Sequence, residues 1–163
     1  MLIGVISDTH GYLHSNVFKV FRGVDHILHA GDIGAEEVIL ELETIAPVTA
    51  VLGNGDFFRG SERYGQFEIL DFHDIKILLT HQYPGYGKAS DALQGMVQMI
   101  SPQIIISGHT HSPHHQQKDQ VLLFNPGSGG QTLYYAEKSV GLINIQPSSN
   151  GQKEVRGEII QLG

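Results

Sequence analysis

Cysteine is absent from this chain of 163 residues. Its absence excludes disulfides, thiolate metal ligands and a cysteine nucleophile, and it is compatible with the cytoplasmic location that we expect. Long apolar runs are also absent, since none approaches the roughly 20 residues of a membrane span. The stretch from Met1 to Ile6 has no basic region and no cleavage-type site, so we interpret it as a first strand rather than a signal peptide. We therefore expect no membrane partner.

Basic residues are scarce. Lysine and arginine number 10 against 17 aspartates and glutamates, giving a formal net charge of −7. This balance argues against nucleic-acid binding and against a nuclease, because both depend on clustered basic side chains. A phosphate-ester substrate is not excluded, because bound metal cations would reverse the local field. Histidine, in contrast, is as frequent as lysine and arginine combined, and imidazole is the commonest metal ligand.

The pattern of apolar residues predicts an α/β fold in one domain spanning residues 1–163. The first half alternates predicted strands with helical spacing, which indicates a βαβαβ unit with a parallel sheet. Its expected strands are 2–7, 26–29 and 48–52, and its expected helices are 17–21 and 35–45. The second half mixes a helix over 90–100 with strands over 67–71, 75–80, 103–107, 114–118, 121–124, 133–137, 140–146 and 154–160. We expect two packed sheets with helices on the outer faces.

Polar side chains follow five of these predicted strands, where each strand ends. In α/β sheets, sites form outside the carboxyl ends of the strands, so we expect these side chains to meet at one edge. Four imidazoles, two carboxylates and one amide oxygen suit two divalent ions with one carboxylate bridging. Such a pair, about 3.5–4 Å apart, clamps the attacking and leaving oxygens of a phosphoryl displacement. The residues are Asp8, His10, Asp32, Asn54, His81, His109 and His111.

Each of these residues also has a purely structural interpretation. Asp8 and Asp32 are favoured helix-cap and turn residues, and Asn54 after Gly53 is typical of a tight turn. His81 ends a buried run, where a hydrogen-bonded core histidine is an alternative. The agreement of seven candidates favours metal binding over these readings. For His29 we expect a structural role, and for Asp56 loop orientation and an ordinary turn remain equally open.

Taken in order, the motifs resemble those of the calcineurin-like metallophosphoesterases. They are Asp-Thr-His at 8–10, Gly-Asp at 31–32, Gly-Asn-Gly-Asp at 53–56, Thr-His at 80–81 and Gly-His-Thr-His at 108–111. The segments 7–11, 29–32 and Asn-Pro-Gly-Ser at 125–128 narrow the resemblance to the small bacterial and archaeal branch of phosphodiesterases. The ordered match runs from residue 7 to about residue 129.

This resemblance implies an αββα sandwich of two mixed sheets flanked by helices, the metallo-dependent phosphatase-like fold. It also implies two divalent ions, with manganese expected and zinc, nickel or iron as alternatives. Asp32 would bridge the ions, and Asp32 and Asn54 would act in catalysis. One ion would take Asp8, His10, Asp32 and His111, and the other Asp32, Asn54, His81 and His109.

The resemblance further implies a metal-dependent phosphodiesterase that hydrolyses a small phosphate ester with a hydroxide bridging the two metals. The sequence does not fix the oligomeric state, and a homo-oligomer is compatible with it. The alternative is a catalytically weak or inactive metal-binding scaffold for protein interactions, because a eukaryotic retromer subunit resembles the same fold and keeps most metal positions.

The sequence departs from the family pattern at three places. Many members have a histidine that acts as general acid just after the Gly-Asn pair, whereas this chain has Gly55. Gln82-Tyr83 stands where Gly-His is frequent, and Gly129-Gly130-Gln131 stands where Pro-Arg is frequent. Since a positioned general acid contributes about 10²–10⁴-fold, we expect a slower enzyme or one that favours good leaving groups.

Overall fold

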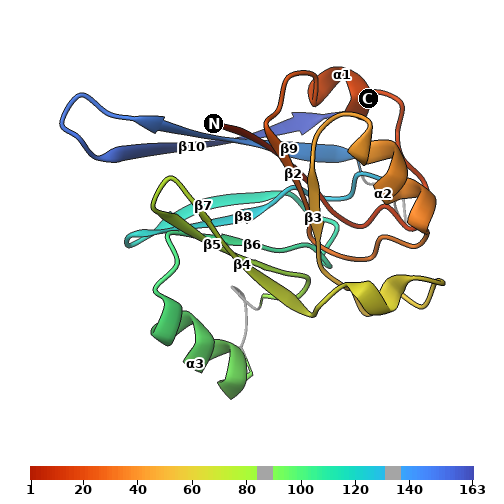
Figure 1. Cartoon of the computed structure of the whole chain (residues 1–163), viewed down its shortest axis with the longest axis horizontal. Coiled ribbons are helices and arrows are strands. Elements are labelled where there is room, and N and C mark those ends of the chain that lie inside the picture. The colour runs from red at the N-terminus through yellow and green to blue at the C-terminus, as the bar shows by residue number, and fades with distance from the viewer. Residues whose placement is uncertain (84–89, 131–136) are drawn as a thin grey trace.

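The computed structural model describes residues 1–83, 90–130 and 137–163, and their strands form two five-stranded sheets (Figure 1). The first sheet has the order β10-β9-β1-β2-β3. Strands β1, β2 and β3 are parallel to one another, whereas β9 is antiparallel to β1 and β10 is antiparallel to β9. The strands are β1 (Leu2–Ile6), β2 (His26–His29), β3 (Val48–Ala50), β9 (Ser139–Pro147) and β10 (Lys153–Gln161).

The second sheet has the order β4-β5-β6-β8-β7. The pairs β5–β6 and β6–β8 are parallel, and the outer pairs β4–β5 and β7–β8 are antiparallel hairpins. Both sheets are therefore mixed. The strands are β4 (Phe67–Phe72), β5 (Ile75–Thr80), β6 (Ile104–Ile106), β7 (His114–Lys118) and β8 (Val121–Asn125).

Helices cover the outer faces of the two sheets. In Figure 1, α1 and α2 lie on the side of the first sheet and α3 lies on the side of the second. A 3₁₀ helix, η1, connects the two halves of the chain. The helices are α1 (Val17–Val20), α2 (Glu36–Glu43), α3 (Asp91–Ile100) and η1 (Ser61–Arg63).

Three apolar clusters hold these four layers together. The cluster between the sheets includes Ile77, Leu79 and the fully buried Phe124. The alternation of a strand places Leu78, between Ile77 and Leu79, on the opposite face, where it packs with Leu93 of α3. The third cluster fills the space between the first sheet and helices α1 and α2. The arrangement is an αββα sandwich, which confirms the fold expected from the sequence.

The predicted βαβαβ unit is confirmed, with shorter elements than the sequence indicates. The third strand ends at Ala50 instead of residue 52, because the Leu52 amide donates to the carbonyl of Gly65, outside the first sheet. The predicted strand over 133–137 falls outside the described residues except for Glu137. Within the described ranges, no helix is long and apolar enough to cross a membrane.

Candidate metal centre

The seven candidate ligands come from both sheets and meet at one edge of the sandwich. Four of them follow the parallel strands β1, β2 and β3 of the first sheet, and three follow β5 and β6 of the second. Asp8, Asp32 and His81 are buried, whereas His10, Asn54 and His109 are exposed. The centre thus has a buried floor of two carboxylates and an imidazole, and a rim that solvent can reach.

The ligand atoms form one continuous series of close contacts. From Asp8 Oδ1 the series passes to His111 Nε2 at 3.2 Å, to His10 Nε2 at 3.4 Å and to Asp32 Oδ2 at 3.7 Å. From Asp32 Oδ2 it continues to His81 Nε2 at 3.5 Å. His81 Nε2 lies 3.0 Å from Asn54 Oδ1, and Asn54 Oδ1 lies 3.0 Å from His109 Nδ1, where the series ends. The structure therefore brings together all seven residues singled out in the sequence, with Asp32 at the middle of the series.

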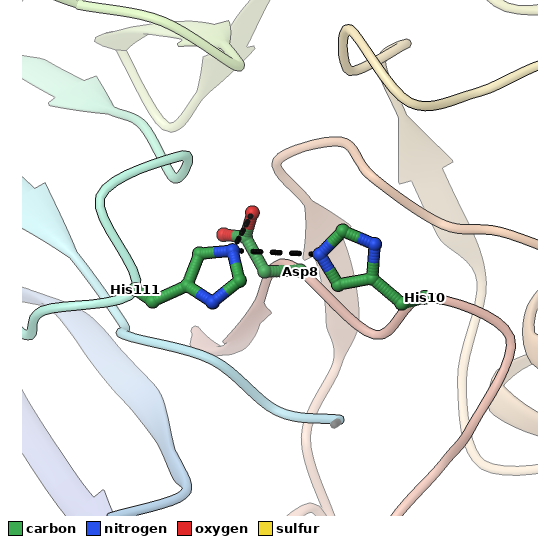
Figure 2. A group of neighbouring side chains, drawn as sticks. All are labelled: Asp8, His10 and His111. Atoms are coloured by element: carbon green, nitrogen blue, oxygen red, sulfur yellow. Dashed lines mark hydrogen bonds and ion pairs between the residues drawn. The ribbon is translucent and has the colours of Figure 1, made fainter. Parts of the chain in front are cut away.

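Asp8, His10 and His111 point toward one another (Figure 2). Each offers a ligand atom, and these atoms lie within 4.8 Å of one another. Asp8 Oδ2 accepts hydrogen bonds from Ser7 Oγ at 2.6 Å and from the His109 amide at 3.0 Å. Asp8 Oδ1 is buried and has no hydrogen-bond partner among the described residues, although His111 Nε2 lies close by. One carboxylate oxygen is therefore held in place and the other faces the two imidazoles.

The two carboxylate oxygens of Asp32 also differ in their contacts, as those of Asp8 do. Its Oδ1 accepts a hydrogen bond of 2.8 Å from the Gly55 amide. Its Oδ2 faces both His10 and His81. The hydrogen bond to Oδ1 fixes the rotation of the carboxylate, and that rotation directs Oδ2 between the two groups of ligands.

The second half of the centre is oriented by a backbone contact. His81 Nδ1 lies 2.7 Å from the carbonyl oxygen of Ala30, so Nδ1 carries the proton and donates it. His81 Nε2 is then left with its lone pair, directed at Asn54 and Asp32. A hydrogen bond of this kind, which fixes both the tautomer and the ring orientation, is typical of histidines that bind metals.

The backbone at the centre is strained. Five of the seven candidate ligands have positive φ angles, between 48° and 70°, a region that residues with a side chain rarely adopt. The five are Asp8, His10, Asp32, His109 and His111. Such strain costs roughly 1–2 kcal/mol per residue, and strained residues cluster at functional sites.

Buried residues around the centre hold its loops together. Asp56 accepts hydrogen bonds from the Gly34 and Gly53 amides, both at 2.8 Å, so it joins the loops that carry Asp32 and Asn54. These two hydrogen bonds favour loop orientation over an ordinary turn residue as the role of Asp56. Asn125 Nδ2 donates to the Gly108 carbonyl at 2.8 Å and thereby fixes the loop that carries His109 and His111.

Ser7 is the buried positioning residue that sequence reasoning missed. Its hydroxyl donates to Asp8 Oδ2, and its contact explains Gly108, where a Cβ atom would lie 1.8 Å from Ser7 Oγ. The signal in the sequence was the pair Ser7 and Gly108, each directly before a candidate ligand. Their proximity depends on the packing of β1 against β6 across the sandwich.

The electrostatics of the first group follow from the contact between Asp8 and His111. Burial by itself raises the pKa of Asp8, but the contacts with His111 and Ser7 lower it overall. The same contact with Asp8 raises the pKa of His111 above its ordinary value. The Asp8 carboxylate is therefore ionised at neutral pH and available to a cation.

Comparisons with known proteins agree with this geometry. Residues 1–148 match the calcineurin-like phosphoesterase superfamily domain, and the chain belongs to that family. A protein of Methanothermobacter thermautotrophicus named a probable metallophosphoesterase is 40% identical over 135 residues, covering 78% of this chain and 77% of the relative. A phosphodiesterase of Methanocaldococcus jannaschii is 29% identical, covering 78% of this chain and 83% of the relative. The crystal structure of Entamoeba histolytica Vps29 complexed with zinc has a TM-score of 0.73 at 25% identity, covering 100% of each chain.

His29 lies beneath the centre and is completely buried. Its Nδ1 accepts a hydrogen bond from the Gly31 amide at 3.2 Å, and its Nε2 lies 2.8 Å from Thr9 Oγ1. Thr9 Oγ1 in turn donates to the Ile33 carbonyl, so it is free to accept a hydrogen bond from His29. A neutral imidazole with its proton on Nε2 therefore donates to Thr9 and accepts from the Gly31 amide. Burial lowers the pKa of His29 to about 4, which agrees with the structural role expected for this residue.

We predict that His29 makes the protein acid-sensitive. Because its pKa is lowered from 6.5 to about 4 by folding, its contribution to stability is complete above pH 6.5 and is lost as the pH falls toward 4. In chelator-treated protein, His29→Gln should lower the free energy of unfolding at pH 7 by about 1–3 kcal/mol and flatten its decline between pH 6.5 and 4. Urea denaturation across this range measures both effects. His73→Asn, in the exposed turn between β4 and β5, is the control, and an unchanged slope in His29→Gln would contradict the assignment.

Proposed function

We propose that this protein is a metal-dependent phosphodiesterase with two divalent ions. One ion would be bound by Asp8, His10, Asp32 and His111, and the other by Asp32, Asn54, His81 and His109. The observation that carries the proposal is the unbroken series of ligand contacts with Asp32 Oδ2 at its middle. Membership of the calcineurin-like family supports it independently.

The donor atoms fit metal ions in spacing and in chemistry. Atoms bound at 2.0–2.2 Å to one ion lie about 3.0–3.5 Å from one another, and neighbours in the series are separated by 3.0–3.7 Å. Asp8 Oδ1 is a buried ionised oxygen that accepts no hydrogen bond from the described residues, and a cation would satisfy it. Mixed carboxylate, amide and imidazole donors suit manganese, and zinc, nickel and iron bind the same donors more tightly than manganese in general.

The residues of the centre would divide the catalytic work. When bound, two divalent ions supply Lewis acidity and lower the pKa of water, so that hydroxide attacks phosphorus at neutral pH. Asp32, shared by both groups of ligands, would hold the two groups in a fixed relative position. Asn54, which is exposed at the rim, would orient an oxygen of the phosphate group through its side-chain amide.

The charge of the centre favours a diester over a monoester. The carboxylates of Asp8 and Asp32 offset two of the four positive charges of two divalent ions, and the attacking hydroxide offsets a third. Neither the seven side chains nor the described residues that line the adjoining cavity include a lysine or an arginine. The remaining single positive charge matches the single negative charge of a phosphodiester, whereas a monoester dianion would need another cation.

An alternative function, a metal-binding scaffold for protein interactions, is favoured by Gly55. Glycine has no group that protonates a leaving oxygen, and Gln82, whose Nε2 lies 3.4 Å from Asn54 Oδ1, carries a neutral amide that is no acid. In the enzyme, water or a metal-bound group would therefore supply this proton. Turnover itself separates the two functions.

We predict manganese-dependent hydrolysis of bis(p-nitrophenyl) phosphate. Asp8→Ala and His109→Ala should each lower kcat/KM by at least about 100-fold, because each removes a ligand from a different metal. His73→Asn should retain wild-type activity. Protein that binds two equivalents of manganese but hydrolyses none of a panel of phosphate esters would support the scaffold and exclude the enzyme.

We also predict that Gly55→His improves the hydrolysis of esters with poor leaving groups. The gain in kcat on phenyl or alkyl diesters should reach about 100-fold, with little change for p-nitrophenyl esters, which need no general acid. A Cβ at position 55 would lie 3.2 Å from Asp32 Oδ1, so Gly55→Ala measures the cost of that contact alone. If Gly55→His gains nothing over Gly55→Ala on the poor leaving groups, the absence of a general acid does not limit this enzyme.

A further inference from the structure

A cavity of about 400 Å³ adjoins the candidate metal centre. Asn54 and His81 belong both to its lining and to the proposed second metal group. The lining also includes Phe67, the first residue of β4, and Leu93 and Met96 of α3. Its volume lies within the range of about 300–1,000 Å³ that is usual for small-molecule sites.

Among the described residues that line this cavity, there is no acidic side chain, lysine or arginine. Its apolar part comes from Leu52, Phe67, Leu93 and Met96, and its polar part includes the neutral side chains of Gln66, Gln82 and Ser90. A charged group that entered the cavity would lose hydration without gaining an ionic partner among these described residues. An uncharged ring would exchange water for aromatic and thioether contacts, both of which favour ring partners.

The cavity also communicates directly with the centre. Gln82 lines the cavity and places its Nε2 3.4 Å from Asn54 Oδ1. A phosphate held at the metal ions would therefore have one ester oxygen at the mouth of the cavity. The organic group attached to that oxygen would extend toward Phe67 and Met96.

We propose that this cavity binds the organic group of the phosphate ester and selects an uncharged planar ring, of aryl to nucleobase size. The inference rests on the proposed phosphodiesterase function and specifies its substrate class. Met96 and Phe67 provide the apolar contacts to the faces of the ring. The amides of Gln66 and Gln82 both donate and accept hydrogen bonds, so they suit the polar edge of a heterocycle.

The test compares two ligands with the same head group, using calorimetry on manganese-loaded protein. Phenylphosphonate should bind at least about tenfold more tightly than methylphosphonate, because only the former buries a ring. A third ligand, 4-carboxyphenylphosphonate, should lose this advantage because its additional charge has no partner among the described residues of the cavity. Binding is measured directly, without turnover.

Variants of helix α3 assign the effect to the cavity. Met96→Ala should reduce the preference for phenylphosphonate to about threefold or less, and Met96→Gln, which nearly conserves volume, should also reduce it. Met99→Ala is the matched control, since Met99 is on the same helix, is 82% exposed and does not line the cavity. Methylphosphonate should bind all of these proteins equally.

Two results would overturn the inference in different ways. Equal affinities for the phenyl and methyl ligands, or equal effects of Met96→Ala and Met99→Ala, would exclude the cavity as the ring site and leave the phosphate centre intact. If neither phosphonate binds to the manganese-loaded protein, the proposed phosphodiesterase centre fails, and the assignment of the cavity fails with it.

Discussion

The carboxylate of Asp32 lies between the two proposed groups of metal ligands. Its Oδ1 is held by the Gly55 amide, and its Oδ2 faces His10 on one side and His81 on the other. These two histidines come from different sheets, so the position of Oδ2 depends on how the sheets pack. The apolar cluster between the sheets, which includes Phe124 and Ile77, therefore determines the relative positions of the candidate ligands as well as the stability of the fold.

Assembling this centre has an energetic cost that the rest of the sandwich offsets. Five ligands lie in the left-handed region of the backbone, and two carboxylates are buried close to four imidazoles. Hydrogen bonds donated by Ser7 to Asp8, by Gly55 to Asp32 and by Gly34 to Asp56 keep the loops in this arrangement. Bound cations would lower the remaining cost by satisfying the Asp8 oxygen that accepts no hydrogen bond from the described residues, so metal binding and folding stability should be coupled.

The sequence was sufficient to predict the layers and which side chains lie together at one edge, for physical reasons. Each ligand follows an apolar run at a strand end, and carboxyl ends of parallel strands meet at one edge, so proximity could be inferred without knowing the strand order. The alternation of Ile77, Leu78 and Leu79 between two apolar clusters likewise reflects a sheet covered on both faces. The shortness of β3 could not be predicted, because it depends on a hydrogen bond from Leu52 to the distant Gly65.

The residue that positions a candidate ligand and the residues that line the cavity could not be predicted either, because both depend on contacts between distant segments. Ser7 and Gly108 are separated by 101 positions and meet only because β1 and β6 belong to facing sheets. The cavity combines Phe67 of β4 with Met96 of α3, which are typical core residues when considered separately. No local pattern distinguishes a methionine that lines a cavity from one, such as Met99, that is exposed to solvent.

The bridging role of Asp32 is tested most directly by titrating metal-free protein with manganese in a calorimeter. The wild-type chain should bind two ions, and His111→Ala should retain one site of nearly normal affinity. Asp32→Ala should weaken both sites together, because its Oδ2 serves each of them. Two sites of wild-type affinity in Asp32→Ala, or a single site in the wild-type chain, would contradict a shared carboxylate at the middle of the centre.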